Sequence, residues 1–99
     1  MVNKMSPVHP GEVLKEELEE LNISARSLAS KLGVPTNRIT GVLNQKRSIT
    51  PDTALRLARY FGTSPEFWLN LQQAYDLKMT RQTKGAEIET VVEPLDANG

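Results

Sequence analysis

The chain has 99 residues, of which 38% are hydrophobic and 24% charged, as is typical of one small globular domain with a modest core that a partner subunit could stabilise. It contains no cysteine, which excludes disulfides, thiolate metal sites and a cysteine nucleophile and favours a reducing cytosol. No apolar run reaches the length of a signal peptide or the ~20 residues of a membrane span, so we expect a cytoplasmic protein with no membrane partner.

The formal net charge of zero hides an uneven distribution of charged side chains. Residues 1–23 carry two basic and five acidic side chains, residues 24–59 carry seven and one, and residues 60–99 carry three and six. The stretch "GVPTNRITGVLNQKR", residues 33–47, has no acid at all. A basic middle between acidic ends favours contact with a polyanion, although charges scattered over a solvated surface would give a similar count.

The first two predicted helices are short. The first runs from about Gly11 to Asn22; glutamates occupy its solvated side, and its core stripe consists of Leu14, Leu18 and Leu21. The second, "SARSLASKL", is expected to have Ser24 as its N-cap and to end at Gly33. Because an isolated helix of two turns is marginal in water, packing must hold it in place.

A third helix is predicted from Pro35 or Thr36 to about Asn44, and its two sides differ. The apolar side consists of Ile39, Val42 and Leu43. The other side offers hydroxyls, amides and bare backbone, and consists of Thr36, Asn37, Thr40, Gly41 and Asn44. Glycine inside a helix costs ~1 kcal/mol relative to alanine, so Gly41 indicates a close approach to this side, unless it is simply tolerated.

The fourth and fifth predicted helices both follow a hydroxyl N-cap and a proline. The fourth follows Thr50 and ends at Gly62, and the fifth follows Ser64 and runs to about Met79. The fifth carries more apolar surface than four small helices can cover. We therefore expect part of it to form a dimer interface, with the candidates Phe67, Trp68, Leu71 and Tyr75.

The second and third helices together are predicted to form a helix-turn-helix unit. Apolar, small and glycine residues fill seven places of that motif in register: Leu28, Ala29, Leu32, Gly33, Val34, Ile39 and Val42. A helical hairpin would match two or three of them by chance. Gly33 can adopt the positive φ that the tight turn demands. The third helix is then the element that can enter a major groove.

The expected organisation has three parts. Residues 1–9 form an N-terminal arm, residues 10–79 form a helix-turn-helix DNA-binding domain with a dimerisation helix, and residues 80–99 form a flexible or strand-like tail. The tail is weakly strand-like because Ile88 stands between acids and two valines follow it. The fold class is all-α.

From about His9 to Leu77, seven-tenths of the chain, the sequence resembles Cro/repressor-like (XRE) helix-turn-helix proteins and, within them, the HigA or VapI antitoxins. The stretches "HPGE", "KRSITPDTALRLARYFGTSPEFWLNLQ" and "YDL" carry the resemblance. It implies a five-helix Cro/repressor-like domain that binds a pseudo-palindromic operator as a homodimer and represses its own operon. It also implies that the chain neutralises a HigB/RelE-like ribonuclease toxin of a type II toxin–antitoxin module. The tail could then add an edge strand to the toxin or to the other subunit.

One position departs from the family pattern. Members often have glycine where this chain has Gln45. Either Gln45 adopts the left-handed conformation, at a cost of ~1 kcal/mol, or the third helix ends one residue earlier, on Asn44.

DNA contacts are assigned by residue type and position. Thr36, Asn37, Arg38 and Thr40 lie where the start of a recognition helix meets base edges, since asparagine can pair with adenine, arginine with guanine and a threonine methyl with thymine. Gly41 would let the helix backbone lie close to the groove, while cations and hydroxyls beside the helices, including Ser48, are placed for phosphates. The DNA-binding candidates are Ser24, Arg26, Thr36, Asn37, Arg38, Thr40, Gly41, Asn44, Lys46 and Arg47. Arg56 and Arg59 are either further contacts or merely solvated.

Other functions remain open. A free-standing repressor without a toxin would have the same fold, and a protein-interaction module could have lost contact with DNA. An enzyme is least expected, because the single His9 has no paired nucleophile and no second histidine with which to bind a metal. We expect a structural or capping role for His9, no cofactor and no metal.

Overall fold

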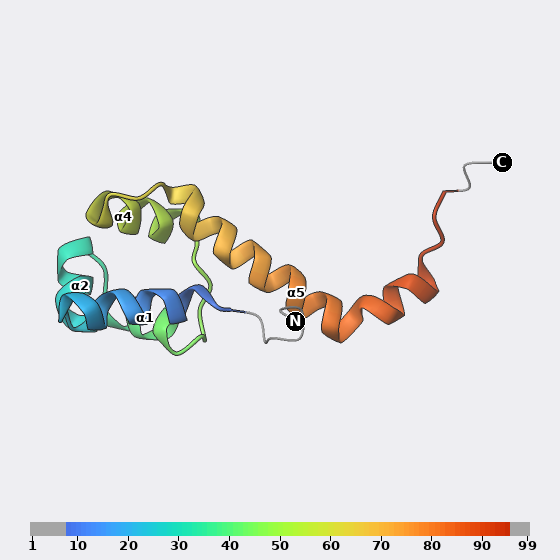
Figure 1. The fold of residues 1–99 in the computed structure, drawn as a ribbon, viewed down its shortest axis with the longest axis horizontal. Coiled ribbons are helices and arrows are strands. Elements are labelled where there is room, and N and C mark those ends of the chain that lie inside the picture. The colour runs from blue at the N-terminus through green and yellow to red at the C-terminus, as the bar shows by residue number, and fades with distance from the viewer. Residues whose placement is uncertain (1–7, 96–99) are drawn as a thin grey trace.

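The structure, a computed structural model, describes residues 8–95, and these residues form five helices and no strand. The helices are α1 (Pro10–Leu21), α2 (Ala25–Leu32), α3 (Thr36–Leu43), α4 (Pro51–Phe61) and α5 (Pro65–Val91). Helices α1–α4 form one body, and α5 starts on it and then projects beyond it (Figure 1). The expected all-α, five-helix fold is confirmed. Residues 1–7 of the proposed arm and 96–99 of the tail lie outside the described residues.

The helix ends lie within a residue of their predicted places, except for the end of α5. The side chains of Ser24, Thr50 and Ser64 each accept a hydrogen bond from the backbone N–H three residues further on. Gly33 and Gly62 end their helices in the left-handed conformation, with φ of 73° and 75°. Each cap satisfies a backbone group that the helix itself leaves without a partner, which is why these ends can be predicted locally.

The core lies among all five helices. Helix α2 packs against α3 and α4, α1 against α3 and α5, and α4 against α5. Of the predicted core residues of the helix-turn-helix unit, Val34 and Leu43 are half-buried against the core and the others are buried: Leu28, Ala29, Leu32, Ile39 and Val42. Leu21, the last leucine of the predicted stripe on α1, is instead 50% exposed, because α1 ends there and no neighbouring helix covers it.

Two polar side chains fasten α5 to the rest of the domain. The Trp68 Nε1 donates to Thr63 Oγ1 at 3.0 Å. The buried Gln72 accepts from the backbone N–H of Ile49 at 2.7 Å through Oε1 and donates to Asp76 Oδ1 at 3.0 Å. Gln72 therefore ties α5 to the loop between α3 and α4, and no pattern in the sequence predicts this link.

The expectation of a flexible or strand-like tail is wrong for residues 80–91, which continue α5. Once a helix is nucleated, each further residue adds one hydrogen bond, and six of these twelve residues are good helix formers, namely Arg81, Gln82, Lys84, Ala86, Glu87 and Glu89. No strand lies within residues 8–95 with which an extended segment could pair. The helix ends at Val91, three residues before Pro94, which disfavours the helical conformation of the residue before it.

Candidate nucleic-acid interface

The acid-free side of α3 faces solvent. Thr36, Asn37 and Asn44 are exposed, and Thr40 and Gly41 are half-buried. The opposite side is locked into the core by residues that are almost fully buried, Ile39 at 0% and Val42 at 1% exposure. The helix therefore presents donors and acceptors on a rigid support, which is the geometry that reading of base edges requires.

Cations and hydroxyls flank this face. The flanking candidates Ser24, Arg26, Lys46, Arg47 and Ser48 are all exposed. The Oγ of Ser24 already accepts from the amide of Ser27 at 3.0 Å, but its O–H remains able to donate to a phosphate oxygen. Among these candidates, the structure brings Arg47 against Gly41 and places Arg38, Arg47 and Ser48 around one small pocket.

The turn after α3 is closed by the backbone of Gly41. Its carbonyl accepts from the amides of Lys46 and Arg47, at 2.8 and 3.1 Å. A Cβ on Gly41 would lie 2.8 Å from Cδ of Arg47, so the Arg47 side chain fills the space that the missing side chain leaves. In this structure, therefore, the close approach predicted at Gly41 is made by a side chain of the same chain.

Gln45 resolves the departure from the family pattern. Its φ is +62°, while Asn44 before it has φ −88°. The first of the two alternatives is therefore the one adopted, and Gln45 carries the left-handed strain of about 1 kcal/mol that a glycine would avoid. The turn still directs Lys46 and Arg47 back over Gly41.

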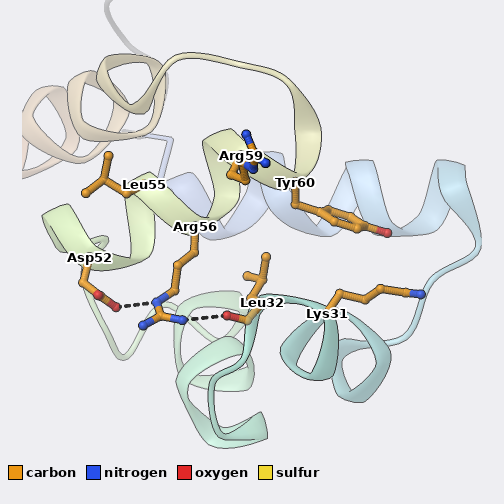
Figure 2. Close-up of a pocket in the computed structure, with 7 residues that line it drawn as sticks. All are labelled: Lys31, Leu32, Asp52, Leu55, Arg56, Arg59 and Tyr60. Atoms are coloured by element: carbon orange, nitrogen blue, oxygen red, sulfur yellow. Dashed lines mark hydrogen bonds and ion pairs between the residues drawn. The ribbon is translucent and has the colours of Figure 1, made fainter.

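Arg38 is held by an acid from another helix. Its Nη1 donates to Oδ2 of Asp52, at the start of α4, and the same oxygen accepts from Arg56 Nε at 2.9 Å. Arg56 Nη1 also donates to the carbonyl of Leu32 at 2.7 Å, and Figure 2 shows this chain of contacts from Asp52 through Arg56 to the end of α2. Hydrogen bonds from Arg56 and then from Arg38 hold the pKa of the Asp52 carboxyl below its usual range.

This network bears on Arg56 and leaves the alternatives for Arg59 as they were. Arg56 links α4 to α2, so it is neither simply solvated nor free to reach DNA without giving up these bonds. Arg59 is exposed and lines an open groove of ≈ 500 Å³ between α2 and α4, together with Lys31, Leu55 and Tyr60 (Figure 2).

His9 lies beside the contact between α1 and α3. It caps α1, accepting through Nδ1 from the amide of Gly11 at 2.8 Å, and its ring meets that of Tyr75 edge-on with centroids 4.8 Å apart. Gly11 lies against the end of α3, since a Cβ there would stand 2.0 Å from the carbonyl oxygen of Val42. The predicted capping role of His9 is confirmed, and α1 and α3 are in backbone contact beside it.

Burial, with His9 only 3% exposed, lowers the pKa of its imidazole, and the charges of Asp76 and Glu12 and a backbone hydrogen bond with Arg47 only partly offset this. Above the unfolded pKa of 6.5, both states hold a neutral imidazole and the full contribution to stability is present. As the pH falls below 6.5, the unfolded chain takes up a proton more readily than the folded chain does. The free energy of unfolding therefore decreases until the pH is below the folded pKa, where both states are protonated.

We therefore expect the free energy of unfolding to fall between pH 7 and pH 5, by less than about 1.4 kcal/mol per pH unit, the limit for one proton. Urea unfolding at several pH values measures this. His9 is the only histidine, so the variant His9→Asn, which keeps a capping oxygen but does not titrate, should be less stable at pH 7 yet flatter across this range. An equally steep profile in the variant would assign the dependence to another group.

The dimer candidates divide into two kinds. Trp68 is 1% exposed and belongs to the protomer's own core, so its assignment to a dimer interface is wrong. The sequence could not show that α4 and the loop before α5 close around it. Leu71 packs half-buried against the same core, and Tyr75 against His9. Phe67 is 44% exposed and remains a candidate, and Leu77, at 50%, lies further along the same helix.

Sequence reasoning missed three residues that shape this site. One feature of the sequence could have drawn attention to Asp52, which is the only acid between residues 24 and 59. No feature of the sequence indicates that Gly11 contacts Val42 or that Gln72 bonds to Ile49. Within residues 8–95, no helix has both the length and the apolar character needed to cross a membrane, and no three potential metal-ligating side chains gather.

Two short helices joined at a left-handed glycine, with an acid-free outer face flanked by cations, define a helix-turn-helix protein. The helix-turn-helix family matches residues 14–68. Virulence-associated protein I of Dichelobacter nodosus is 52% identical over 83 residues, which cover 83% of this chain and 77% of that protein. The structure of an addiction module antidote protein of a HigA family from Coxiella burnetii is 60% identical, with a TM-score of 0.89 over 92% of this chain and 100% of the other.

The structure of the Pseudomonas aeruginosa antitoxin HigA with the higBA promoter is 43% identical, with a TM-score of 0.88 over 91% of this chain and 99% of the other. The chain therefore belongs to the helix-turn-helix family and, within it, to the HigA-type antitoxins, as its resemblance implied. This is a family of DNA-binding regulators and antitoxins, not of enzymes.

Proposed function

We propose that this HigA-type antitoxin binds a pseudo-palindromic operator in its own promoter as a homodimer and represses its operon. The observation that carries the proposal is the outer face of α3, exposed, free of acids and followed by Lys46 and Arg47. The promoter-bound Pseudomonas relative, similar over nearly the whole chain, supports it. In this proposal Thr36, Asn37 and Thr40 contact base edges, and the flanking cations and hydroxyls contact phosphates.

A dimer follows from the size of the reading surface. One α3 of eight residues reads only a few base pairs, so adequate specificity needs two units about 34 Å apart on one face of the duplex. The surface proposed for the dimer contact is the exposed part of α5 around Phe67, with Leu71 and Tyr75 at its edge. Working on operator DNA, the protein would reside in the cytoplasm and associate with the nucleoid.

The second part of the proposal is that the chain neutralises a HigB/RelE-like ribonuclease toxin. Its support is membership of the HigA-type antitoxins. The competing function is a free-standing repressor of the same fold without a toxin partner. A toxin-sized reading frame beside this gene favours the antitoxin, and its absence favours the repressor.

Two measurements test these claims. In a mobility-shift titration, the full chain should shift its promoter fragment with a stoichiometry of two protomers per site and a steep loss of affinity with salt. Binding no tighter than to a scrambled duplex would contradict the repressor role. Co-expression with the neighbouring reading frame should yield a stable complex in which ribonuclease activity is suppressed; free, active toxin beside this protein would contradict neutralisation.

A further inference from the structure

The only acid in residues 24–59, Asp52, lies at the edge of the proposed DNA-binding face. It joins three helices through one oxygen: Arg38 on α3 and Arg56 on α4 both donate to Oδ2, and Arg56 continues to the carbonyl at the end of α2. Figure 2 shows Asp52 and Arg56 side by side, with the guanidinium reaching Leu32. An acid in this place needs an explanation, because the rest of the face excludes acids.

Stability alone does not explain it. The side chains of Arg38, Asp52 and Arg56 are 31%, 54% and 41% exposed, and ion pairs this open to water contribute little to stability. The effect of Asp52 on the electrostatic attraction between Arg38 and a phosphate is larger than its effect on stability. A carboxylate in contact with Arg38 cancels most of the charge that this guanidinium would offer to a phosphate, and it repels a phosphate itself.

The surroundings show what Arg38 would otherwise contact. Arg38 and Arg47 line a small pocket of ≈ 140 Å³ together with the hydroxyls of Ser48, Thr50 and Thr53, and Asp52 is the acid in its wall. The hydroxyls of Thr50 and Thr53 are bonded to each other, but two guanidinium groups and the Ser48 hydroxyl suit a phosphate oxygen, whatever the sequence of the duplex. With Asp52 present, a backbone phosphate enters this pocket only against the carboxylate.

We propose that Asp52 is a positioning residue for DNA specificity: it withholds Arg38 from the phosphates of arbitrary duplex and holds it at the edge of α3 for the operator. The proposal rests on the proposed DNA-binding function. On arbitrary DNA, the ion pair stays closed and Arg38 adds nothing to affinity. On the operator, base contacts by the rest of α3 bring the duplex close enough for Arg38 to act from a prearranged position.

The test uses the full-length chain, its promoter fragment and a scrambled duplex of the same length and composition, titrated by fluorescence anisotropy between 50 and 200 mM salt. In Asp52→Asn, the freed Arg38 should tighten binding to the scrambled duplex by up to roughly tenfold at 50 mM salt and steepen the salt slope by ~0.9. Operator affinity should change less, so the ratio of the two affinities falls.

A double-mutant cycle separates positioning from simple charge. If Asp52 acts mainly through Arg38, Asp52→Asn should tighten scrambled-duplex binding by a clearly smaller factor in an Arg38→Ala background, where only the direct repulsion by the carboxylate is relieved. Equal tightening in both backgrounds would show that the Asp52 charge acts directly on DNA and would overturn the proposal. No tightening in either background would also overturn it.

A matched control comes from α5. Glu66 follows Ser64 and Pro65, as Asp52 follows Thr50 and Pro51, and it is an exposed acid in the first helical turn. Glu66→Gln changes the net charge by the same amount, so equal tightening there would overturn the proposal.

Should Asp52→Asn lose helix content by circular dichroism, Asp52→Ser replaces it in the same cycle. If the wild type does not distinguish the promoter from the scrambled duplex, the proposed function itself fails.

Discussion

Replacing Asn37 with alanine is expected to weaken binding to the promoter roughly 5- to 150-fold, equivalent to about 1–3 kcal/mol, while affinity for an unrelated duplex stays within about twofold. The reason is its place and chemistry. Asn37 is exposed in the first turn of α3, where its amide can make two hydrogen bonds to one adenine. Losing it removes a base contact and leaves the phosphate contacts intact, so discrimination is lost and general affinity is kept.

Parallel anisotropy titrations against the two duplexes measure this difference. Gln82→Ala is the control, because it also replaces a side-chain amide by a methyl group at an exposed position on α5, away from the proposed DNA-binding face and beyond the proposed dimer contact. Both variants should unfold within about 0.5 kcal/mol of the wild type, as exposed substitutions usually do. Weakening of both duplexes by the same factor would mean that Asn37 does not read a base.

Replacing Gly11 with alanine is expected to destabilise the fold by about 3 kcal/mol and to lower Tm by roughly 10–20 °C. The intrinsic preference of helices for alanine would act the other way by ~1 kcal/mol. The clash dominates because the new Cβ would stand 2.0 Å from the carbonyl oxygen of Val42 and 3.1 Å from Nδ1 of His9. Since Val42 belongs to α3, relief of the clash also displaces the proposed DNA-binding helix.

Thermal unfolding followed by circular dichroism checks this prediction. The matched control is Gly85→Ala on α5, where the nearest atom to an added Cβ lies 4.0 Å away. That variant should gain up to about 1 kcal/mol from its better helix propensity. A Gly11→Ala protein as stable as the wild type would show that α1 and α3 are not in rigid contact.

The helix boundaries and the outer face of α3 were predictable because they depend on neighbours in the chain. A hydroxyl cap such as Ser24 bonds an amide three residues away, and Gly33 ends α2 with a conformation available to it locally. The charge pattern of α3 likewise follows from a period of 3.6 residues. The failure at residues 80–91 arose where local signals were weak and an existing helix could simply continue.

The sequence by itself determined the helix-turn-helix unit, its buried stripe and its acid-free side, since each follows from residue type at fixed spacing. Only the tertiary structure decided that Trp68 is core, that Gly11 touches Val42 and that Arg38 is held by Asp52. These contacts join residues 14 to 31 positions apart, or enclose one side chain from several helices. Their partners are selected by how the helices pack, which no local pattern specifies.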